Sequence, residues 1–456
     1  MELVVLGNST SAIAAIESFR EIDENSNITI VSNEAWTAPY SRPLIAEYLS
    51  GEKTYEEILY RPETFYEEKN IIKLDGLEAV QIDSESQVVL LNDGRNICYD
   101  RLLIATGSTP TCPNIPGIQR EGIHSFWTLE DAQQIAKSVK ITETAVVAGA
   151  GLVGLSAAHA LSTLGLNVVV VELLNQILAQ NLDATAAQIV QMYMVKQGLI
   201  VLTGRGIQEI RGDGKNGNVT EVILDDGQQI SCELVIMCTG VRPTIDFLKN
   251  SRIRTASGIL VNNYLQTSEP DVYAAGDVAQ PYDPIYREQR MVANLGNARE
   301  QGRIAGMNLA GEKREYKGGI AMVAMRYFGV PWISVGANSC PRPTCHEIVG
   351  LHSEKEGIYD KLLIEDGTLV GAILVGDITQ GGILTNLIRN GTKLGTAEQS
   401  LAKRGLFFAR LRKQLFQSEM EGPPGYVDWR KSIGMEKKYK KKIDEGRWRK
   451  KEHGEA

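Results

Sequence analysis

The chain has 456 residues, enough for about three domains, and 43% of them are hydrophobic. Its formal net charge of −8 disfavours nucleic acid as the main partner. The six cysteines form no CxxC pair, so the sequence indicates neither a disulfide framework nor a zinc ribbon and fits a reducing cytoplasm. The first apolar stretch begins within a few residues of Met1, so we expect no signal peptide.

The N-terminal stretch reads as a strand, a tight turn and a helix. Residues 3–6 are apolar, and an Ala-rich segment follows the turn that begins at Gly7. This turn is a degenerate GxGxxG, because Ser9 and Ala12 stand where the second and third glycines would be. Alanine is tolerated at the third position since a methyl group still permits close packing, and the Ser9 hydroxyl is itself able to donate to a phosphate.

A second strand of this unit is predicted at residues 28–31. Glu34 follows it and is the expected ribose acceptor, although a shift in register would give that role to Ser32. Residues 38–44 are rich in turn formers and lead into a helix.

Further strands of the same unit follow along the chain. A strand pair is predicted at residues 77–83, which include Ala79, and 88–91. A buried strand is predicted at residues 99–104. It ends in a turn of small residues, namely Ala105, Thr106 and Gly107.

The most informative stretch is residues 145–172, which again read as strand, Gly turn, helix and strand. Gly149, Gly151 and Gly154 form a complete GxGxxG directly after an apolar run. The first glycine permits the turn, the second lets the backbone approach a pyrophosphate, and the third lets the helix pack on the strand. This arrangement predicts a dinucleotide site.

The helix after this turn begins at Leu152 and Val153, and its N-terminus offers unpaired N–H groups to phosphates. Glu172 ends the second strand and suits both ribose hydroxyls, so we expect NAD(H) rather than NADP(H). Residues 145–171 contain no charged residue, which raises the alternative of a membrane span. The turn glycines disfavour this alternative. A Walker loop is excluded because Leu155 and Ser156 follow the last glycine. A Gly turn without a ligand is the third alternative.

Two later segments repeat the first pattern. Residues 235–238 are an apolar strand that leads into Thr239 and Gly240. Another strand ends in Gly276 and Asp277. A carboxylate there suits a polyol or ribityl hydroxyl, and an ordinary helix cap is the alternative. The chain therefore contains two similar nucleotide units, one inserted in the other.

From Gly318 onward the pattern changes to that of a smaller α+β domain. It is expected to consist of strands at 320–336, 359–364 and 368–375 and a helix at 383–391. Cys340 and Cys345 lie in a Pro-rich loop beside His346. A plain surface loop is favoured there over a metal or redox site, because too few ligands are visible.

The last 61 residues, 396–456, look like a docking segment. A capping-box pattern at 396–399 opens an amphipathic helix. Residues 424–456 then carry 11 Lys/Arg against 6 Asp/Glu, interleaved with tyrosine and tryptophan. We favour docking on an acidic partner or assembly over a disordered arm or nucleic-acid binding.

Four motifs occur in an order that resembles the FAD-dependent pyridine nucleotide-disulfide oxidoreductase superfamily. They are YDRLLIATGSTP, GAGLVG with Glu172, CTGVRP and DVYAAGDVA. The segments PYSRPLIAEYLSG and LVGAILVGD resemble the branch of NADH:rubredoxin reductases and nitrite reductase flavoproteins. The turn GNSTSA looks like that of FAD subunits of anaerobic complexes, such as phenylglyoxylate dehydrogenase or tungsten aldehyde oxidoreductase.

The resemblance implies an α/β fold with two nested Rossmann-like dinucleotide-binding domains, a smaller α+β C-terminal domain and a basic tail. The implied divisions are an FAD-binding domain at 1–113 and 248–317, an NAD-binding domain at 114–247, a C-terminal α+β interface domain at 318–395, and an amphipathic helix and basic tail for docking at 396–456.

The resemblance also implies which residues hold the two cofactors. FAD is expected to contact its pyrophosphate-binding turn, its ribose acceptor, the flavin-side Arg-Pro pair and the ribityl-side Asp, namely Gly7, Ser9, Ala12, Glu34, Arg42, Pro43, Ala79, Ala105, Thr106, Gly107, Gly276 and Asp277. NAD(H) is expected at Gly149, Gly151, Leu152, Val153, Gly154, Glu172 and Gly240.

Two departures from the family pattern change the expected chemistry. Residues 36–51 contain no cysteine, so thiol–disulfide exchange, which needs a thiolate, is excluded at this position. The Lys and Glu that many relatives carry beside the flavin are replaced by Ala46 or Glu47 and by Ser156. The joint loss leaves no unpaired buried charge.

The expected function is hydride transfer between NAD(H) and FAD, followed by single-electron exchange with an iron–sulfur protein or subunit. The protein is expected to be the flavoprotein subunit of a hetero-oligomeric complex that reduces NAD⁺, in the cytoplasm. No metal site or side-chain acid–base catalyst is predicted. The alternatives are a stand-alone rubredoxin or ferredoxin reductase, an NADH oxidase or peroxidase, and a non-catalytic FAD-containing assembly scaffold.

Overall fold

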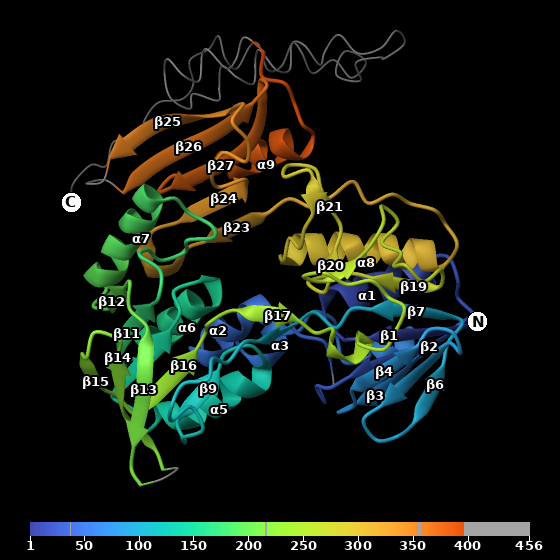
Figure 1. Ribbon diagram of the computed structural model, residues 1–456, viewed down its shortest axis with the longest axis horizontal. Helices are drawn as coiled ribbons and strands as arrows, with labels where there is room; N and C mark the ends of the chain where they lie inside the picture. Colours follow the sequence, from blue (N-terminus) through green and yellow to red (C-terminus); the bar gives the residue numbers. More distant parts are fainter. Residues whose placement is uncertain (37, 215–216, 354–356, 396–456) are drawn as a thin grey trace, which may run out of the picture.

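The computed structural model describes residues 1–36, 38–214, 217–353 and 357–395. The predicted docking helix and basic tail at 396–456 therefore lie outside the described residues. Figure 1 shows three lobes, two built on parallel sheets and one on the antiparallel sheet of the C-terminal domain. Among the helices within the described ranges, none combines the length and the apolar character that crossing a membrane requires.

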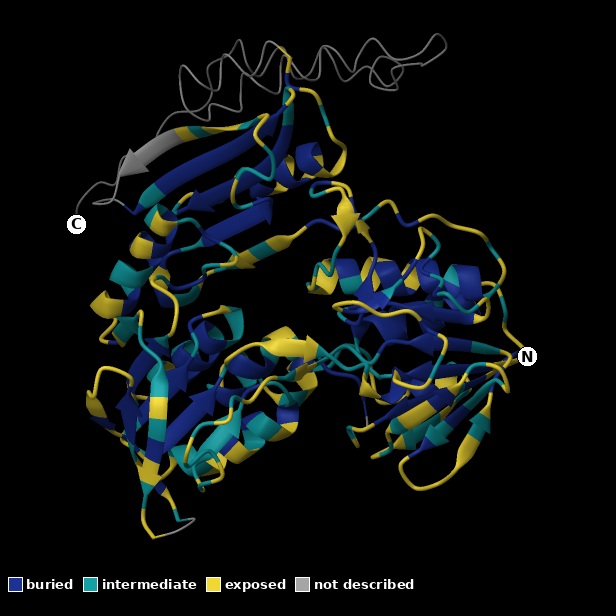
Figure 2. Ribbon diagram, viewed as in Figure 1, coloured by how far each residue is buried: buried dark blue, intermediate teal, exposed yellow. Residues whose placement is uncertain are grey.

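The first unit is built on a five-stranded parallel sheet. Its strands, in spatial order, are β19 (Val272–Ala274), β7 (Arg101–Ile104), β1 (Glu2–Leu6), β2 (Asn27–Ser32) and β3 (Ile71–Asp75). The central strands are buried on both faces, which explains their continuous apolar sequence (Figure 2). Because β19 comes more than 160 residues after β7, the second unit is inserted into the first.

Smaller elements complete the first unit. An antiparallel sheet comprises β4 (Ala79–Asp83), β5 (Val88–Leu91) and β6 (Asn96–Cys98). The remaining short elements are η1 (Arg42–Leu44), α2 (Ile45–Leu49), α3 (Tyr55–Ile58), α4 (Phe65–Glu68), η2 (Asp246–Leu248), β18 (Ile259–Leu260), β20 (Ala279–Gln280), β21 (Tyr282–Asp283) and β22 (Glu288–Gln289).

Two helices of this unit, α1 (Thr10–Arg20) and α8 (Leu295–Leu309), lie in close backbone contact. A Cβ atom built on Gly302 of α8 would lie 2.1 Å from the carbonyl oxygen of Ser11. One built on Gly306 would lie 2.1 Å from the carbonyl oxygen of Ala15. The glycines that this helix pair needs are therefore on α8.

The second unit repeats the parallel architecture. Its sheet has the order β12 (Ile200–Thr203), β11 (Asn167–Glu172), β10 (Thr144–Ala148), β16 (Leu234–Met237) and β9 (Ile123–Ser125). Its helices are α5 (Leu129–Val139), α6 (Leu152–Thr163) and α7 (Ala184–Lys196). A separate antiparallel sheet comprises β13 (Ile207–Gly212), β14 (Val219–Leu224) and β15 (Gln229–Ser231).

The two chain segments that join the units pair with each other. β8 (Ser108–Pro110) and β17 (Val241–Pro243) form a short antiparallel ribbon. Beside it, the Thr106 hydroxyl donates to the Thr244 carbonyl at 2.9 Å, and the hydroxyls of Thr109 and Thr244 are 2.7 Å apart. Both crossings between the two nucleotide units are thus joined in one ribbon.

The C-terminal domain is a five-stranded antiparallel sheet covered on one face by α9 (Gly381–Arg389). Its order is β23 (Met322–Met325), β24 (Trp332–Gly336), β27 (Thr368–Val375), β26 (Ile358–Glu365) and β25 (Cys345–Ser353). The prediction of one strand at 320–336 is wrong, because the 3-10 turn η3 (Tyr327–Gly329) divides it into β23 and β24. The other face of the sheet, including the buried Trp332, packs on the second unit.

Cys340 and Cys345 form a disulfide, which corrects the expectation of a plain surface loop without one. The chain turns sharply between them, so that their Cα atoms lie 5.4 Å apart, within the range that a disulfide spans. Spacing in sequence does not indicate this, since a five-residue separation is compatible with many loop shapes.

The buried carboxyl of Asp360 in β26 makes the stability of this domain depend on pH. Burial, together with the neighbouring Asp377, raises the pKa of Asp360 from 3.8 to about 6. The folded state therefore holds this proton more tightly than the unfolded chain, and its stability falls by up to about 3 kcal/mol as the pH rises from about 4 to above 6. We expect Asp360→Asn to raise the melting temperature at pH 8 and to change it little at pH 4.

Melting curves of the wild-type and variant proteins across this pH range provide the measurement. Asp271→Asn, which removes an exposed carboxylate of the first unit, is the matched control and should follow the wild-type profile. If Asp360→Asn raised the melting temperature equally at pH 4 and pH 8, the prediction would be contradicted.

Candidate functional site

A cavity of about 870 Å³ lies between the two nucleotide units and the C-terminal domain. Its wall includes the turn after β1, the end of β2, the residues after β7, the helices α2 and α6, and β23. Of the residues predicted from the sequence, the following line it: Gly7, Ser9, Glu34, Arg42, Pro43, Ala105, Thr106, Gly107, Leu152, Val153 and Asp277. One cavity thus brings together parts predicted to hold FAD and parts predicted to hold NAD(H).

The first Gly turn lets β1 and β7 approach closely beside the cavity. Gly7 has a φ of +108°, and a Cβ atom at this position would lie 2.2 Å from the carbonyl oxygen of Ala105. Ser9 is the N-cap of α1, and its side chain makes no capping hydrogen bond. Its hydroxyl and the first N–H groups of α1 can therefore bind an anionic group from the cavity. Ala12 is fully buried in α1 and does not line the cavity.

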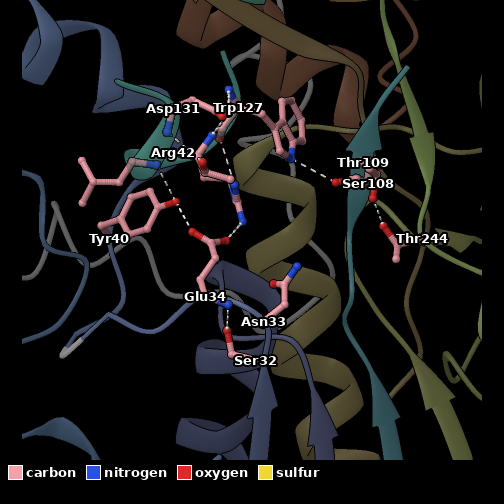
Figure 3. Close-up of polar contacts among 12 residues, drawn as sticks. Ser32, Asn33, Glu34, Tyr40, Arg42, Ser108, Thr109, Trp127, Asp131 and Thr244 are labelled. Carbon is pink, nitrogen blue, oxygen red and sulfur yellow. Dashed lines mark hydrogen bonds and ion pairs between the residues drawn. The ribbon is translucent and has the colours of Figure 1, made fainter. Parts of the chain in front are cut away.

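Glu34 lies at the cavity wall, but its carboxylate already has two side-chain partners (Figure 3). It forms an ion pair with Arg42 and accepts a hydrogen bond from the Tyr40 hydroxyl. Burial raises the pKa of Tyr40, so this hydroxyl stays protonated and donates. The predicted ribose role of Glu34 stays a prediction, and it would use the lone pairs that these two contacts leave.

The same cluster ties the first unit to the second. Arg42 donates to the carbonyl of Trp127 at 2.9 Å, and the Trp127 indole N–H donates to the Ser108 carbonyl at 3.0 Å (Figure 3). Asp131 accepts from the backbone N–H groups of Trp127 and Thr128 at 2.8 and 2.9 Å. Arg42 is thus held by its ion pair with Glu34 and by its hydrogen bond to the Trp127 carbonyl. Sequence reasoning missed Tyr40 and Trp127, which no motif pattern marks as polar contacts across the units.

Asp277 lies in the cavity wall directly after Gly276. Burial raises the pKa of this carboxyl, while Arg42 opposes the shift. Gly276 has a φ of +83° and lies against Ser11, where a Cβ atom would be 2.6 Å from the hydroxyl oxygen. The alternative of a helix cap is wrong, because α8 is capped by Asn294, whose side chain accepts from the N–H of Asn297 at 2.8 Å.

The second Gly turn, between β10 and α6, has one position that is open. A Cβ atom at Gly149 would lie 2.3 Å from the carbonyl oxygen of Cys238, and one at Gly154 would lie 1.9 Å from that of Gly149. At Gly151, the N-cap of α6, no protein atom lies within 4 Å of such a Cβ. The first and third glycines are therefore required by the fold, whereas the second leaves room for a ligand.

Glu172 at the end of β11 stabilises this turn. Its two carboxylate oxygens accept from the backbone N–H groups of Ala150 at 2.6 Å and Leu174 at 2.8 Å. Each oxygen keeps a lone pair, so the carboxylate can also accept from ribose hydroxyls. Gly240, with a φ of +110°, has open space on its Cβ side, and Ala79 lies in β4 away from the cavity lining.

The far wall of the cavity comes from helix α6, helix α2 and the C-terminal domain. Ser156 and His159 of α6 follow Leu152 on one helical face, and Tyr327 of η3 faces them. The Tyr327 hydroxyl lies 3.5 Å from a carboxylate oxygen of Glu47. The sequence offered no signal for Tyr327, because it lies within the segment that we predicted to be a single strand.

Thiol chemistry has no support in this cavity. The described residues that line it include no cysteine. Cys238 lies behind the second Gly turn, where burial raises its pKa to about 12, so it stays a protonated thiol at neutral pH.

Comparisons with known proteins agree with this geometry. Residues 1–302 match the family model of pyridine nucleotide-disulphide oxidoreductases, and residues 322–392 match that of the rubredoxin NAD⁺ reductase C-terminal domain. The chain is 32% identical over 394 residues to the NADH-dependent phenylglyoxylate dehydrogenase subunit epsilon of Aromatoleum evansii, covering 86% of this chain and 92% of that protein.

Two further similarities are informative. The chain is 30% identical over 422 residues to the assimilatory nitrate reductase electron transfer subunit of Bacillus subtilis; this covers 92% of the chain but only 52% of that relative. The crystal structure of NADH:rubredoxin oxidoreductase from Clostridium acetobutylicum is similar with a TM-score of 0.71 and 25% identity, covering 86% of this chain and 96% of that one.

The family match extends over more than half of the chain and includes both Gly turns and Asp277. It agrees with the two nested parallel sheets and with the cavity that they share. The chain belongs to the pyridine nucleotide-disulphide oxidoreductase family and is an oxidoreductase with FAD and NAD(H) as its cofactors.

Proposed function

We propose that this protein passes hydride between NAD(H) and FAD and exchanges single electrons with an iron–sulfur protein. The observation that carries the proposal is that one cavity is lined by the Gly7 turn on one side and by Leu152 and Val153 of α6 on the other. FAD, when bound, supplies the conversion between two-electron and one-electron chemistry. The lack of cysteine among the described lining residues leaves no thiol to relay the electrons.

The residues of the cavity fit FAD. The close approach at Gly7 leaves the N-terminus of α1 open to a pyrophosphate, and the free Ser9 side chain adds a donor. Asp277 offers a carboxylate to a polyol chain, and Arg42 holds a positive charge at the cavity wall. NAD(H) would bind with its pyrophosphate at the open Gly151 position and its ribose on Glu172.

We further propose that the protein works as a flavoprotein subunit of a larger complex and that its net reaction there is NAD⁺ reduction. The likeness to the epsilon subunit of an NADH-dependent phenylglyoxylate dehydrogenase supports this, since it extends over nearly the whole of both chains. A cytoplasmic location and the domain divisions at residues 113/114, 247/248, 317/318 and 395/396 are part of the proposal.

The likeness to an NADH:rubredoxin oxidoreductase favours a second candidate, a stand-alone reductase that oxidises NADH.

Anaerobic addition of NADH to the yellow holoprotein tests what both candidates share, because both require the flavin absorbance to bleach. Purification from the native source then separates them: an iron-containing partner in fixed ratio supports the complex. A protein that holds FAD but is not bleached by NADH would be a scaffold, and the proposal would be rejected.

Gly151→Glu should strongly weaken NADH binding without unfolding the protein. The new side chain meets no protein atom near its Cβ, yet its bulk and charge occupy the space proposed for the pyrophosphate. We expect anaerobic flavin bleaching by NADH to slow by about a hundredfold, equivalent to about 3 kcal/mol of lost binding. FAD content and melting temperature should stay at wild-type values.

Gly382→Glu in α9 is the matched control, because it introduces the same residue at an exposed helical glycine that also has open space around its Cβ. NADH should bleach the flavin of this variant at the wild-type rate. Normal bleaching of Gly151→Glu would show that the nucleotide binds elsewhere.

Glu172→Arg should change the preference between the two nicotinamide nucleotides. The substitution removes acceptors for the ribose hydroxyls, so kcat/KM for NADH should fall by about ten- to a hundredfold. A guanidinium can pair with the 2′-phosphate of NADPH, so the NADPH/NADH ratio should rise. Steady-state assays with both nucleotides provide the measurement.

Glu172→Gln separates nucleotide binding from turn stability, because it keeps a side-chain oxygen that can accept from a backbone N–H of the turn. Its melting temperature should stay close to the wild-type value. It should also lose less NADH activity than Glu172→Arg. An unchanged NADPH/NADH ratio in Glu172→Arg would contradict the assigned role.

A further inference from the structure

Tyr327 lies where three parts of the chain meet. It comes from η3 of the C-terminal domain, and its ring stacks on that of His159 of α6, with centroids 4.6 Å apart and an interplanar angle of 29°. Its hydroxyl lies 3.5 Å from a carboxylate oxygen of Glu47 of α2 and is close to the Ser156 side chain. All four residues line the cavity. One side chain of the C-terminal domain thus contacts both nucleotide units inside the cavity.

The backbone that presents Tyr327 is held in an unusual conformation. The next residue, Phe328, has a φ of +57° although it is not glycine, a conformation that costs roughly 1 kcal/mol or more. Its side chain is only 4% exposed and lies edge-on to His159, with centroids 5.3 Å apart. Packing therefore overrides the local preference, and the direction of Tyr327 is fixed by its surroundings.

The stacked rings of Tyr327 and His159 form an aromatic wall of the cavity. This aromatic wall lies in line with helix α6, which begins at the second Gly turn. Ser156 and His159 follow Leu152 on the cavity face of α6, about 6 and 10 Å further along the helix axis. Leu152, directly after Gly151, and Tyr327 both line the cavity, so a nucleotide whose pyrophosphate bound at Gly151 could reach Tyr327 with its nicotinamide end. The position of the wall therefore limits how far the nicotinamide ring can enter.

The stacked rings of Tyr327 and His159 are uncharged near neutral pH. Burial raises the pKa of Tyr327, which keeps the hydroxyl protonated and able to donate to Glu47. Burial also lowers the pKa of His159, against the opposing effect of the carboxylates of Glu52 and Glu47. A rigid, uncharged aromatic surface suits contact with a planar heteroaromatic ring.

We propose that Tyr327 is a positioning residue for the nicotinamide ring of NAD(H), and that Glu47 and His159 hold it in place. The inference rests on the proposed function for the place of the nucleotide. Tyr327 takes no part in the electron transfer itself: hydride leaves the nicotinamide with both electrons, and the tyrosine limits where the ring lies when this happens. A small displacement of a reacting ring is enough to cost about a hundredfold in rate.

The test uses FAD-loaded Tyr327→Ala and Tyr327→Phe in anaerobic stopped-flow experiments over a range of NADH concentrations. Tyr327→Ala should lower the limiting rate of flavin bleaching at least about tenfold while changing the apparent Kd of NADH by less than about threefold. Tyr327→Phe keeps the ring but loses the hydroxyl contacts, so its limiting rate should fall by about two- to fivefold.

A spectroscopic measurement provides a second readout that does not depend on turnover. When NAD⁺ is added to the chemically reduced protein, stacking of nicotinamide on the flavin gives a long-wavelength charge-transfer band. This band should be lost in Tyr327→Ala and weakened in Tyr327→Phe. Tyr264→Phe is the matched control, because it removes a hydroxyl that donates to Glu315 at 3.2 Å on the exposed surface. It should leave rate and band unchanged.

Each result decides the inference. A wild-type limiting rate and an intact band in Tyr327→Phe and Tyr327→Ala would overturn it, as would a change in NADH affinity alone. If Tyr327→Ala does not retain FAD, Tyr327→Phe carries the test by itself. A wild-type protein that NADH does not bleach would instead refute the proposed function.

Discussion

The pairing of β8 with β17 is the constraint on which the rest of the structure depends. Because the second nucleotide unit is inserted into the first, the chain must cross between them twice, and both crossings form one antiparallel ribbon. Hydrogen bonds of Thr244 with Thr106 and Thr109 extend this contact on the side of the first unit. Two units joined at one short ribbon would be free to rotate, so further contacts must fix the angle between them.

Those contacts are polar on one side of the cavity and apolar on the other. On the polar side, Arg42 links Glu34 at the end of β2 to the backbone at Trp127 (Figure 3). On the apolar side, the sheet of the C-terminal domain buries Trp332 against the second unit. The cavity is thus enclosed by contacts that also orient its walls, and a change in the angle between the units would have to break an ion pair or expose apolar surface.

Much of this arrangement could be predicted from the sequence because it is encoded locally. Gly149 has a positive φ and Gly154 packs against the Gly149 carbonyl, so both glycines are needed for a turn within a few residues of chain. The apolar runs of β1 and β10 reflect burial on both faces of a parallel sheet. The parts that could not be predicted depend on distant contacts. Phe328 adopts a left-handed conformation because it is buried in the hydrophobic core against His159, not because of its own preference. Likewise, no local pattern showed that Glu34 pairs with Arg42.

The two nucleotide units place a glutamate at or just beyond the end of their second strand, but they neutralise it in different ways. Arg42 compensates the charge of Glu34, whereas backbone N–H groups of Ala150 and Leu174 compensate that of Glu172. Backbone donors are part of the fold, so the Glu172 carboxylate is held in place by the turn itself. The Arg42 guanidinium also donates to the Trp127 carbonyl, so the charge that compensates Glu34 is part of the contact between the two units. Compensation of the glutamate charge is therefore tied to the angle between the units in the first case and to the Gly turn in the second.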